Sequence, residues 1–234
     1  MKQSASIRFL CCLAVLGIML VAGSAAMGQT ITPPIAEYRG KAQGYFELRN
    51  DADFPLAATV EVHGFKVSPN GSMAYAPLAS DVEVEFGNSS FTIPARQSHL
   101  VFYKVKSKLP NLWFAIVSTM TRAAPIKNQI RINVALPHVV YLYQKQRLKA
   151  EDVALEVKRQ EDGSYQLQVT NRSNKLSRIE RVQCRGFEKD TELGGMPVFP
   201  ESTRFVKFTA GASSPNASVR VFFQDGFSSE AIPQ

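Results

Sequence analysis

From Gly44 onward, apolar and polar residues alternate in short runs, and turn-forming residues separate these runs. Strict alternation over about four to eight residues indicates half-buried β-strands. Leu112–Met120 is almost wholly apolar, which is typical of a central strand covered on both faces. No stretch shows a sustained helical stripe with caps, although Lys149–Val157 allows one turn. The first half of the chain is therefore predicted to contain strands at Tyr45–Leu48, Ala57–Phe65, Val82–Phe86, Leu100–Val105 and Leu112–Met120.

A polar break at Gln144–Asp152 divides this pattern, and a second, shorter series of strands follows it. Short strands with turn signals between them, such as Asn70-Gly71, favour β-sandwiches. We therefore predict an all-β chain of two sandwich domains, residues 29–145 and 146–234, joined by a short hinge. The strands expected in the second domain are Val153–Val157, Tyr165–Thr170, Ile179–Cys184, Arg204–Phe208 and Val219–Phe223.

Residues 1–28 have the pattern of a cleavable secretory signal. Lys2 and Arg8 precede the apolar run Phe9–Ala22, and small residues follow it. The run is shorter than the roughly 20 residues that a membrane-spanning helix needs. An uncleaved anchor is the alternative, and no later stretch approaches spanning length. We expect an exported chain with no integral membrane segment after cleavage, in which Cys184 is the one remaining cysteine, a half-buried side chain without a disulfide partner.

Composition and charge exclude several classes of protein. The 234 residues are 45% apolar and 20% charged, which excludes a disordered polymer. The formal charge of +7 is not concentrated in any run of like charges, so nucleic-acid binding has little support. Lys104, Lys106 and Lys108 are expected to form the solvated face of a strand.

The search for catalytic and metal-binding residues finds little. His63, His99 and His138 lie far from one another and from cysteine along the chain, and each is expected at the surface or rim. No nucleophile elbow, phosphate-binding glycine loop or zinc-protease motif occurs. We therefore predict no catalytic residue, no metal and no cofactor, which makes an enzyme unexpected.

The most informative stretch is Ile126–Tyr143, in which one row of apolar residues alternates with polar ones. Pro137 cannot donate a backbone hydrogen bond, so it belongs at a sheet edge or a bulge. The row either faces the first domain's own core or lies at an edge that is open to a partner's strand. Four aliphatic side chains would supply about 6–12 kcal/mol when fully buried, before entropic costs. These residues are Ile130, Ile132, Val134 and Leu136.

A set of strand and turn segments runs through both halves of the mature chain: Leu48–Asn50 with Pro55, Ser90–Pro94, His99–Lys104, Leu112–Met120, Thr121–Lys127, Tyr165–Asn171 and Gly194–Pro200. In these segments the mature chain resembles the periplasmic pilus-assembly chaperones of the PapD type. The resemblance implies two immunoglobulin-like domains in an L shape, and a last strand of the first domain that inserts alternating apolar residues into a pilus subunit lacking one strand. By resemblance, those residues are the four of the apolar row. Its further implications are a periplasmic location, a pilus or surface-fibre subunit as partner, and an outer-membrane usher.

The sequence departs from this family in the cleft between the domains. There the family holds the subunit's C-terminal carboxylate with an Arg from the first strand and a Lys from the last. Here Thr32–Ala36 contains no basic residue, and Tyr141 stands at the position of the Lys. Lys145 matches another basic position, and Arg39 or Lys41 either substitutes or lies in a solvated turn. The candidate cleft contacts are Arg39, Tyr141 and Lys145.

The sequence predicts an exported, ATP-independent chaperone-like protein that binds a fibre subunit by strand addition. The alternative is a non-catalytic structural or adhesive two-domain envelope protein, whose edge strand is satisfied internally. A hydrolase with a triad assembled across the cleft is a third class. The sequence does not identify the subunit, the fibre, the organism or the oligomeric state.

Overall fold

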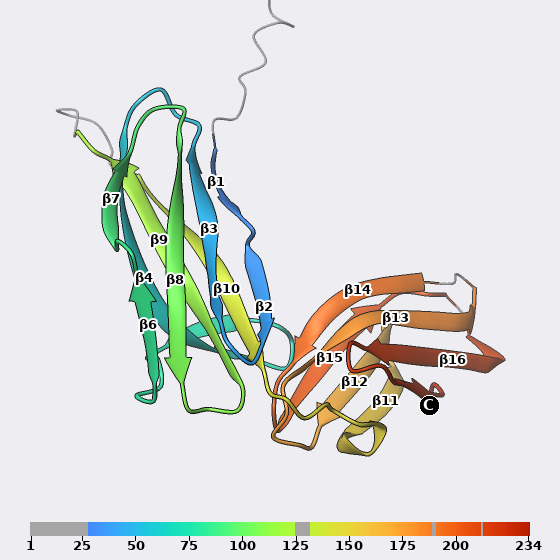
Figure 1. Cartoon of the computed structure of the whole chain (residues 1–234). Coiled ribbons are helices and arrows are strands. Elements are labelled where there is room, and N and C mark those ends of the chain that lie inside the picture. Colours follow the sequence, from blue (N-terminus) through green and yellow to red (C-terminus); the bar gives the residue numbers. More distant parts are fainter. Residues whose placement is uncertain (1–27, 125–131, 189–190, 212) are drawn as a thin grey trace, which may run out of the picture.

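The computed structural model describes residues 28–124, 132–188, 191–211 and 213–234, and strands dominate these residues (Figure 1). The strands form two separate β-sandwiches, one before and one after the polar break at residues 144–149. The all-β, two-sandwich fold class is therefore confirmed. Except for Gly28, the predicted signal segment lies outside the described residues, and so does Ile130.

The first sandwich packs two sheets face to face around one apolar core. Its four-stranded sheet has the order β1 (Gln29–Thr32), β3 (Gln43–Asn50), β8 (Ser98–Ser107), β6 (Val82–Phe86). The opposite sheet has the order β2 (Ile35–Arg39), β10 (Asn133–Tyr143), β9 (Leu112–Arg122), β4 (Leu56–Val67), β5 (Met73–Ala76), and β7 (Ser90–Ile93) also pairs with β4. The largest fully buried side chains between these sheets are Phe46, Leu48, Ile93, Phe114, Ile116 and Met120.

The first segment of the described chain is divided between the two sheets. β1 pairs antiparallel with β3 in one sheet, and β2 pairs parallel with β10 in the other. Pro33 and Pro34 lie between them and have no backbone N–H, so the chain leaves one ladder there before it joins the next. The place where the chain crosses between the sheets sets how much of β10 pairs with β2.

The second sandwich also has two sheets, and a 3-10 turn (Ala150–Asp152) precedes its first strand. One sheet has the order β11 (Val153–Arg159), β12 (Tyr165–Asn171), β15 (Ser202–Phe208). The other has the order β14 (Thr191–Val198), β13 (Ser177–Phe187), β16 (Ser213–Phe223), β17 (Ser228–Ala231). Cys184 is 1% exposed in the core between them, so the expectation of a half-buried side chain is wrong. The alternating pattern of β13 carries its thiol to the core face.

The strands predicted from alternation are present, and several others were missed. β9 lies between β10 and β4 and is apolar on both faces, as its sequence predicts. One face packs into the first core, and Trp113, Ala115 and Val117 on the other face the second sandwich. β5, β14 and β17 were not predicted, because they are short or contain turn-forming residues such as Gly194-Gly195.

An equivalent asparagine ends a strand in each sandwich. The Nδ2 group of Asn50 donates to the carbonyls of Phe54 and Ile93, at 2.9 and 3.1 Å. The Nδ2 group of Asn171 donates to the carbonyls of Lys175 and Phe199, at 2.6 and 3.0 Å. Because both side chains are almost fully buried, each fixes the turn after its strand by satisfying carbonyls that water does not reach.

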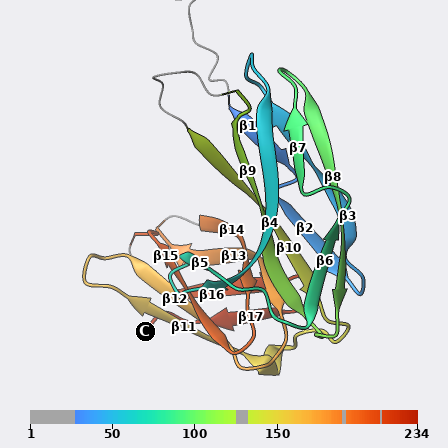
Figure 2. The same ribbon diagram turned by 90° about the vertical axis from the view of Figure 1, so that its left-hand side faces the viewer.

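The two sandwiches form an L, and the β4–β5 hairpin lies beside β15 of the second sandwich (Figure 2). The backbone N–H of Phe205 donates to the carbonyl of Pro69 at 2.8 Å across this contact. Arg204 is 9% exposed, and its Nη1 group donates to the carbonyl of Ser68 at 2.9 Å. Burial lowers the pKa of this guanidinium. The hairpin thus ties the domains together through its backbone.

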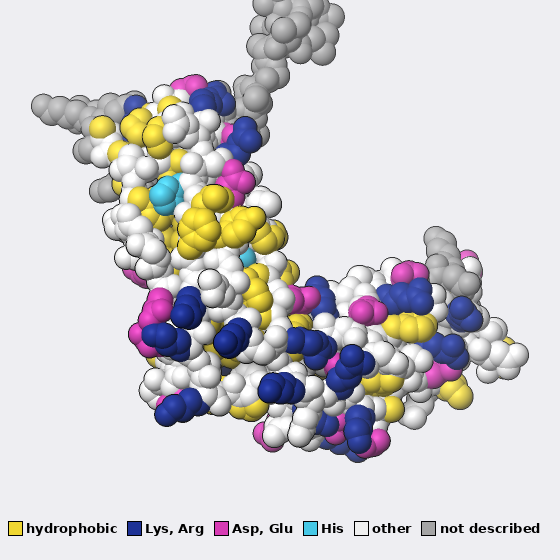
Figure 3. All heavy atoms as spheres, in the orientation of Figure 1, with side chains coloured by type: hydrophobic (Ala, Val, Ile, Leu, Met, Phe, Trp, Pro, Cys, Tyr) yellow, Lys and Arg dark blue, Asp and Glu magenta, His cyan; other side chains and the backbone are white. Residues whose placement is uncertain are grey.

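The outer face of the first four-stranded sheet carries both apolar and basic side chains. Tyr45, Leu100 and Phe102 are 55%, 46% and 56% exposed, and hydrophobic side chains gather on this face of the sandwich (Figure 3). Lys104, Lys106 and Lys108 are exposed, as predicted. Lys106 also forms ion pairs with Glu83 and Glu85 on the neighbouring strand.

Candidate functional site: the open edge of the first sandwich

β10 is paired along its whole length on one side and along half of its length on the other. Its register with β9 runs from Asn133↔Thr121 to Leu142↔Leu112. Its register with β2 begins only at Val139↔Ile35 and ends at Tyr143↔Arg39. Within the described part of the chain, no strand pairs with the other side of Asn133–His138. We refer to this unpaired side of Asn133–His138 as the open edge.

The backbone groups that face the open edge follow from the period of a strand. The N–H group of Val139 points toward β2, because it donates to the carbonyl of Pro34 at 2.8 Å. Backbone polar groups alternate between the two edges of a strand, so Asn133 and Ala135 turn their N–H and C=O groups to the same side as Val139. Pro137 adds a carbonyl and no donor. Its predicted position at a sheet edge is confirmed.

The predicted apolar row passes from solvent into the core. Ile132 is 71% exposed, Val134 and Leu136 are half-buried, and Leu136 packs against the first core. Ile130 cannot be placed, because it lies outside the described residues. Both interpretations from the sequence therefore apply to part of the row: its inner end faces the domain's own core, and Ile132 faces solvent. That these residues bind a guest strand stays a prediction.

His138 ends the open edge, and its predicted position at the surface or rim is wrong. Its side chain is 0% exposed and stacks on Phe46 with ring centroids 4.7 Å apart. Nδ1 lies 2.7 Å from the carbonyl oxygen of Pro33, and Nε2 lies 3.0 Å from the hydroxyl of Tyr103. Burial lowers the pKa of His138, although the bond to the Pro33 carbonyl opposes this shift. His138 points inward because strand alternation places it on the same face as Leu136.

The bend between the sandwiches is filled by an aromatic core of its own. Tyr141 is 6% exposed, and its ring lies 6.4 Å from those of Phe65 and Phe199. Trp113 contributes from β9, with its ring 5.1 Å from Phe199. Burial raises the pKa of the Tyr141 hydroxyl. The candidate cleft contact Tyr141 is therefore a neutral aromatic side chain packed in this core.

Two cations near the bend, Arg39 and Arg178, have anionic partners. Arg39 of β2 lies 3.1 Å from Asp225 and packs over the ring of Tyr143. Arg178 of β13 lies 3.2 Å from Glu37. The carboxylate of Glu37 also accepts a hydrogen bond from the Tyr143 hydroxyl at 2.8 Å. The pKa of this hydroxyl is raised mainly by burial, and secondly by the bond to Glu37. Sequence spacing gave no sign of Glu37, Arg178 or Asp225, because these pairs join residues more than 100 positions apart.

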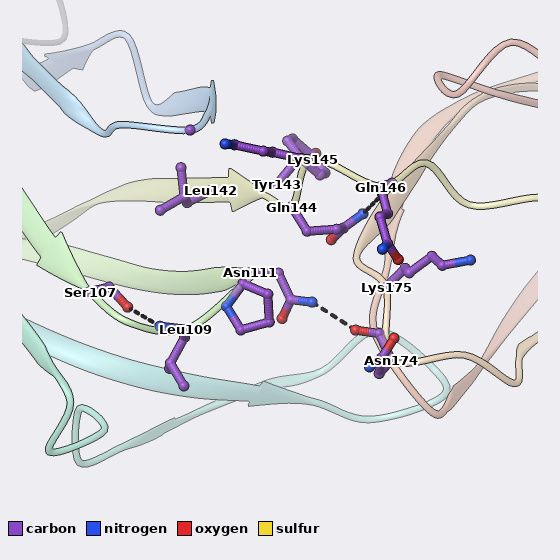
Figure 4. Close-up of a pocket in the computed structure, with 12 residues that line it drawn as sticks. Ser107, Leu109, Asn111, Leu142, Tyr143, Gln144, Lys145, Gln146, Asn174 and Lys175 are labelled. Carbon is purple, nitrogen blue, oxygen red and sulfur yellow. Dashed lines mark hydrogen bonds between the residues drawn. The ribbon is translucent and has the colours of Figure 1, made fainter.

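Lys145 lines a cavity of about 410 Å³ at the hinge (Figure 4). The walls come from both sandwiches, including Pro110 and Asn174, and Asn111 donates to the carbonyl of Asn174 across it at 2.7 Å. The contacts of Arg39, Tyr141 and Lys145 thus place them at an ion pair, in an aromatic core and in a hinge cavity. No described interaction joins the three, so how a subunit's carboxylate would be held stays a prediction.

The described residues contain neither a metal-binding cluster nor a membrane-spanning helix. No group of three or more His, Cys, Asp or Glu side chains lies close enough to hold a metal ion there. No helix in that part of the chain is both long and apolar enough to cross a membrane. The open edge of β10 is the candidate functional site, because it presents backbone groups with which no described strand pairs.

No family model matches this sequence, and no curated protein matches it either. Solved structures do match its fold. The class 5 fimbriae chaperone CfaA aligns with a TM-score of 0.54 at 10% identity, over 88% of this chain and 100% of that chain. The YadV chaperone aligns with a TM-score of 0.54 at 14% identity, over 88% of this chain and 98% of its own.

A chain from the CsuC–CsuE complex, a chaperone–tip adhesion subunit pre-assembly complex of Acinetobacter baumannii, aligns with a TM-score of 0.52. It is 16% identical, and the alignment covers 88% of this chain and 99% of that one. Identities this low establish the fold alone. The protein therefore has the two-sandwich fold of the solved pilus and fimbrial chaperones.

Proposed function

We propose that the protein is a periplasmic, ATP-independent chaperone that binds a pilus or surface-fibre subunit by β-strand addition at the open edge of β10. The observation that carries this proposal is the unpaired side of Asn133–His138, which begins next to the exposed side chain of Ile132. The guest would be a polypeptide that lacks one strand of its own sandwich. Strand addition forms only hydrogen bonds and apolar contacts, so it needs no cofactor.

Backbone and side-chain groups would contribute differently to binding. The N–H and C=O groups of Asn133 and Ala135 would pair with the guest strand and fix its register. Ile132 is fully available to the guest, whereas half-buried Leu136 contributes less, because it already packs on the first core. A fully buried aliphatic side chain supplies about 1.5–3 kcal/mol, so Ile132 is expected to dominate the apolar contribution.

The partner class rests on structures with this fold, and the location rests on the N-terminal sequence. Solved structures with this fold include the SafA pilin in complex with the SafB chaperone of Salmonella enterica, at a TM-score of 0.52 and 13% identity. A subunit of this kind is the partner we propose here, with an outer-membrane usher as the component that would receive it. The periplasmic location rests on the predicted signal in residues 1–28.

The cleft favours a second candidate, a structural or adhesive envelope protein without chaperone activity. Arg39 and Arg178 are each paired with a carboxylate, so neither offers the unneutralised cation that would hold a subunit's C-terminal carboxylate. Under this alternative the chain is a stable monomer that co-purifies with no fibre subunit. The open edge weighs against it, because that alternative expects the edge strand to be covered.

The test is subunit capture by variants of the exposed apolar residue. We expect Ile132→Asp combined with Val134→Asp to reduce the amount of fibre subunit that co-purifies from periplasmic extract at least tenfold, because a buried carboxylate without a partner is strongly unfavourable. Ile232→Asp is the matched control, because Ile232 is 70% exposed against 71% for Ile132 and lies near the end of the second sandwich. Both proteins should give unchanged circular dichroism spectra. Equal capture by both would refute binding through the open edge.

A further inference from the structure

The pairing of β10 with β2 has a defined first bond. It is the bond from the Val139 N–H group to the carbonyl of Pro34, at 2.8 Å. Two residues earlier on the same side is Pro137, which has no N–H to donate. The next position of β10 in the ladder with β2 therefore offers no donor. The change from closed to open edge falls between Pro137 and Val139.

The side chain of His138 holds the preceding carbonyl of the crossing segment. A carbonyl oxygen only accepts, so the 2.7 Å contact with Pro33 assigns the ring proton to Nδ1. Nε2 then accepts from the hydroxyl of Tyr103 at 3.0 Å, and the oxygen of Tyr103 accepts from Tyr38 at 2.9 Å. One chain of hydrogen bonds thus runs from β2 through β8 to β10 and on to the segment between β1 and β2.

The inward-facing neighbours of His138 along β10 are the aliphatic residues Leu136 and Val140. An aliphatic residue at position 138 would fill the same space, but it would leave the Pro33 carbonyl and the Tyr103 hydroxyl with one partner fewer inside the core. An unmade hydrogen bond at a buried group is destabilising. A polar ring here is therefore explained by the groups it holds in place rather than by packing alone.

We propose that His138 is a positioning residue that fixes the crossing between β1 and β2, and with it the length of edge that β10 offers to a guest. The consequence for binding rests on the proposed function. A guest strand would pair with β10 as far as Pro137, and its ladder would stop there. The guest's contacts then centre on Ile132 and Val134, ahead of the covered half of the strand. His138 contacts no guest itself.

Amide hydrogen exchange of the free protein tests the boundary. In His138→Leu we expect the Val139 amide to exchange about tenfold faster, the effect of one lost hydrogen bond. The Tyr141 amide, which faces β2 further along the ladder, should keep its protection. His138→Asn places an amide donor near the position of Nδ1, so it should restore slow exchange at Val139. A purely structural contribution to core packing would give no such rescue.

An unchanged Val139 rate in folded His138→Leu, or an Asn variant that exchanges as fast as the Leu variant, would overturn the proposal. If the Leu variant does not fold, Tyr103→Phe removes only the hydroxyl that orients the imidazole. It should speed exchange at Val139 severalfold more than at Tyr141, and equal changes at the two amides would count against the proposal. The exchange experiment uses the free protein without a guest. Its outcome is therefore independent of the outcome of the capture experiment.

Discussion

Two residues of β10, adjacent in sequence, show what one side chain reveals about its own environment. Pro137 was predicted at an edge because the missing N–H is a property of the residue itself, and the structure places it there. His138 was predicted at the surface because no other ligand-type residue lies near it in sequence. Its partners Pro33 and Tyr103 are 105 and 35 positions away, so sequence spacing could not identify them.

His138 also makes stability depend on pH. Burial lowers the pKa of His138 below the ordinary histidine value of 6.5, so the folded state keeps the ring neutral while the unfolded chain takes up a proton. This part of the stability is therefore constant above about pH 6.5 and falls as the pH drops toward the folded pKa, by at most about 1.4 kcal/mol per pH unit.

We predict that urea unfolding of the wild type shows a larger loss of stability between pH 7.5 and pH 5.5 than His138→Asn shows. The charged residues and the half-buried His63 and His99 are common to both proteins, so the difference isolates the buried imidazole. If the two proteins lose the same free energy over this range, His138 is not held neutral in the folded state.

At the scale of elements, periodicity predicted which segments are strands but not which strand edges stay unpaired. The alternation of Val82–Phe86 and the apolar run of β9 are properties of consecutive residues, so those strands could be predicted. β17 is short and polar, and it exists because β16 offers it an edge. Whether β10 is open depends on where its ladder with β2 begins, which residues 133–143 alone do not encode.

The open edge is also a hazard, because an unpaired strand invites another copy of itself. Pro137 interrupts the row of donors on this edge. We predict that Pro137→Ala raises the fraction of dimer and larger species in sedimentation velocity, because it adds an N–H to the unpaired side. Pro110→Ala, a change in the exposed β8–β9 loop, is the control. Identical sedimentation of both variants would show that the proline does not protect the edge.

At the scale of the whole molecule, the bend is held by an aromatic core and by ion pairs that cross it. Asp225 has a side chain that is 1% exposed, and it accepts from Arg39 at 3.1 Å and from Ser177 at 2.5 Å. Glu37 and Arg178 form a second crossing pair. The prediction of two sandwiches came from the polar break between two series of strands, whereas the angle between the sandwiches depends on these long-range pairs.

We predict that Asp225→Ala destabilises the protein by about 1–3 kcal/mol, because it leaves the Ser177 hydroxyl and the Arg39 guanidinium without their acceptor. The estimate is modest because Arg39 is 43% exposed and reaches water. Small-angle X-ray scattering should show a broader range of dimensions as the bend loosens. Glu230→Gln, which removes an exposed partner of Arg220, should change stability by less than about 1 kcal/mol. Equal effects of the two changes would contradict the account of the bend.

The central claim is that a guest polypeptide pairs with the open edge through its backbone. Hydrogen exchange of a purified complex between this protein and a fibre subunit, compared with the free protein, measures this directly at the amides of Asn133 and Ala135. We predict that both exchange rapidly in the free protein and become protected in the complex, while the amide of Val139 is protected in both. Rapid exchange at Asn133 and Ala135 in a complex that retains its subunit would contradict strand addition at this edge.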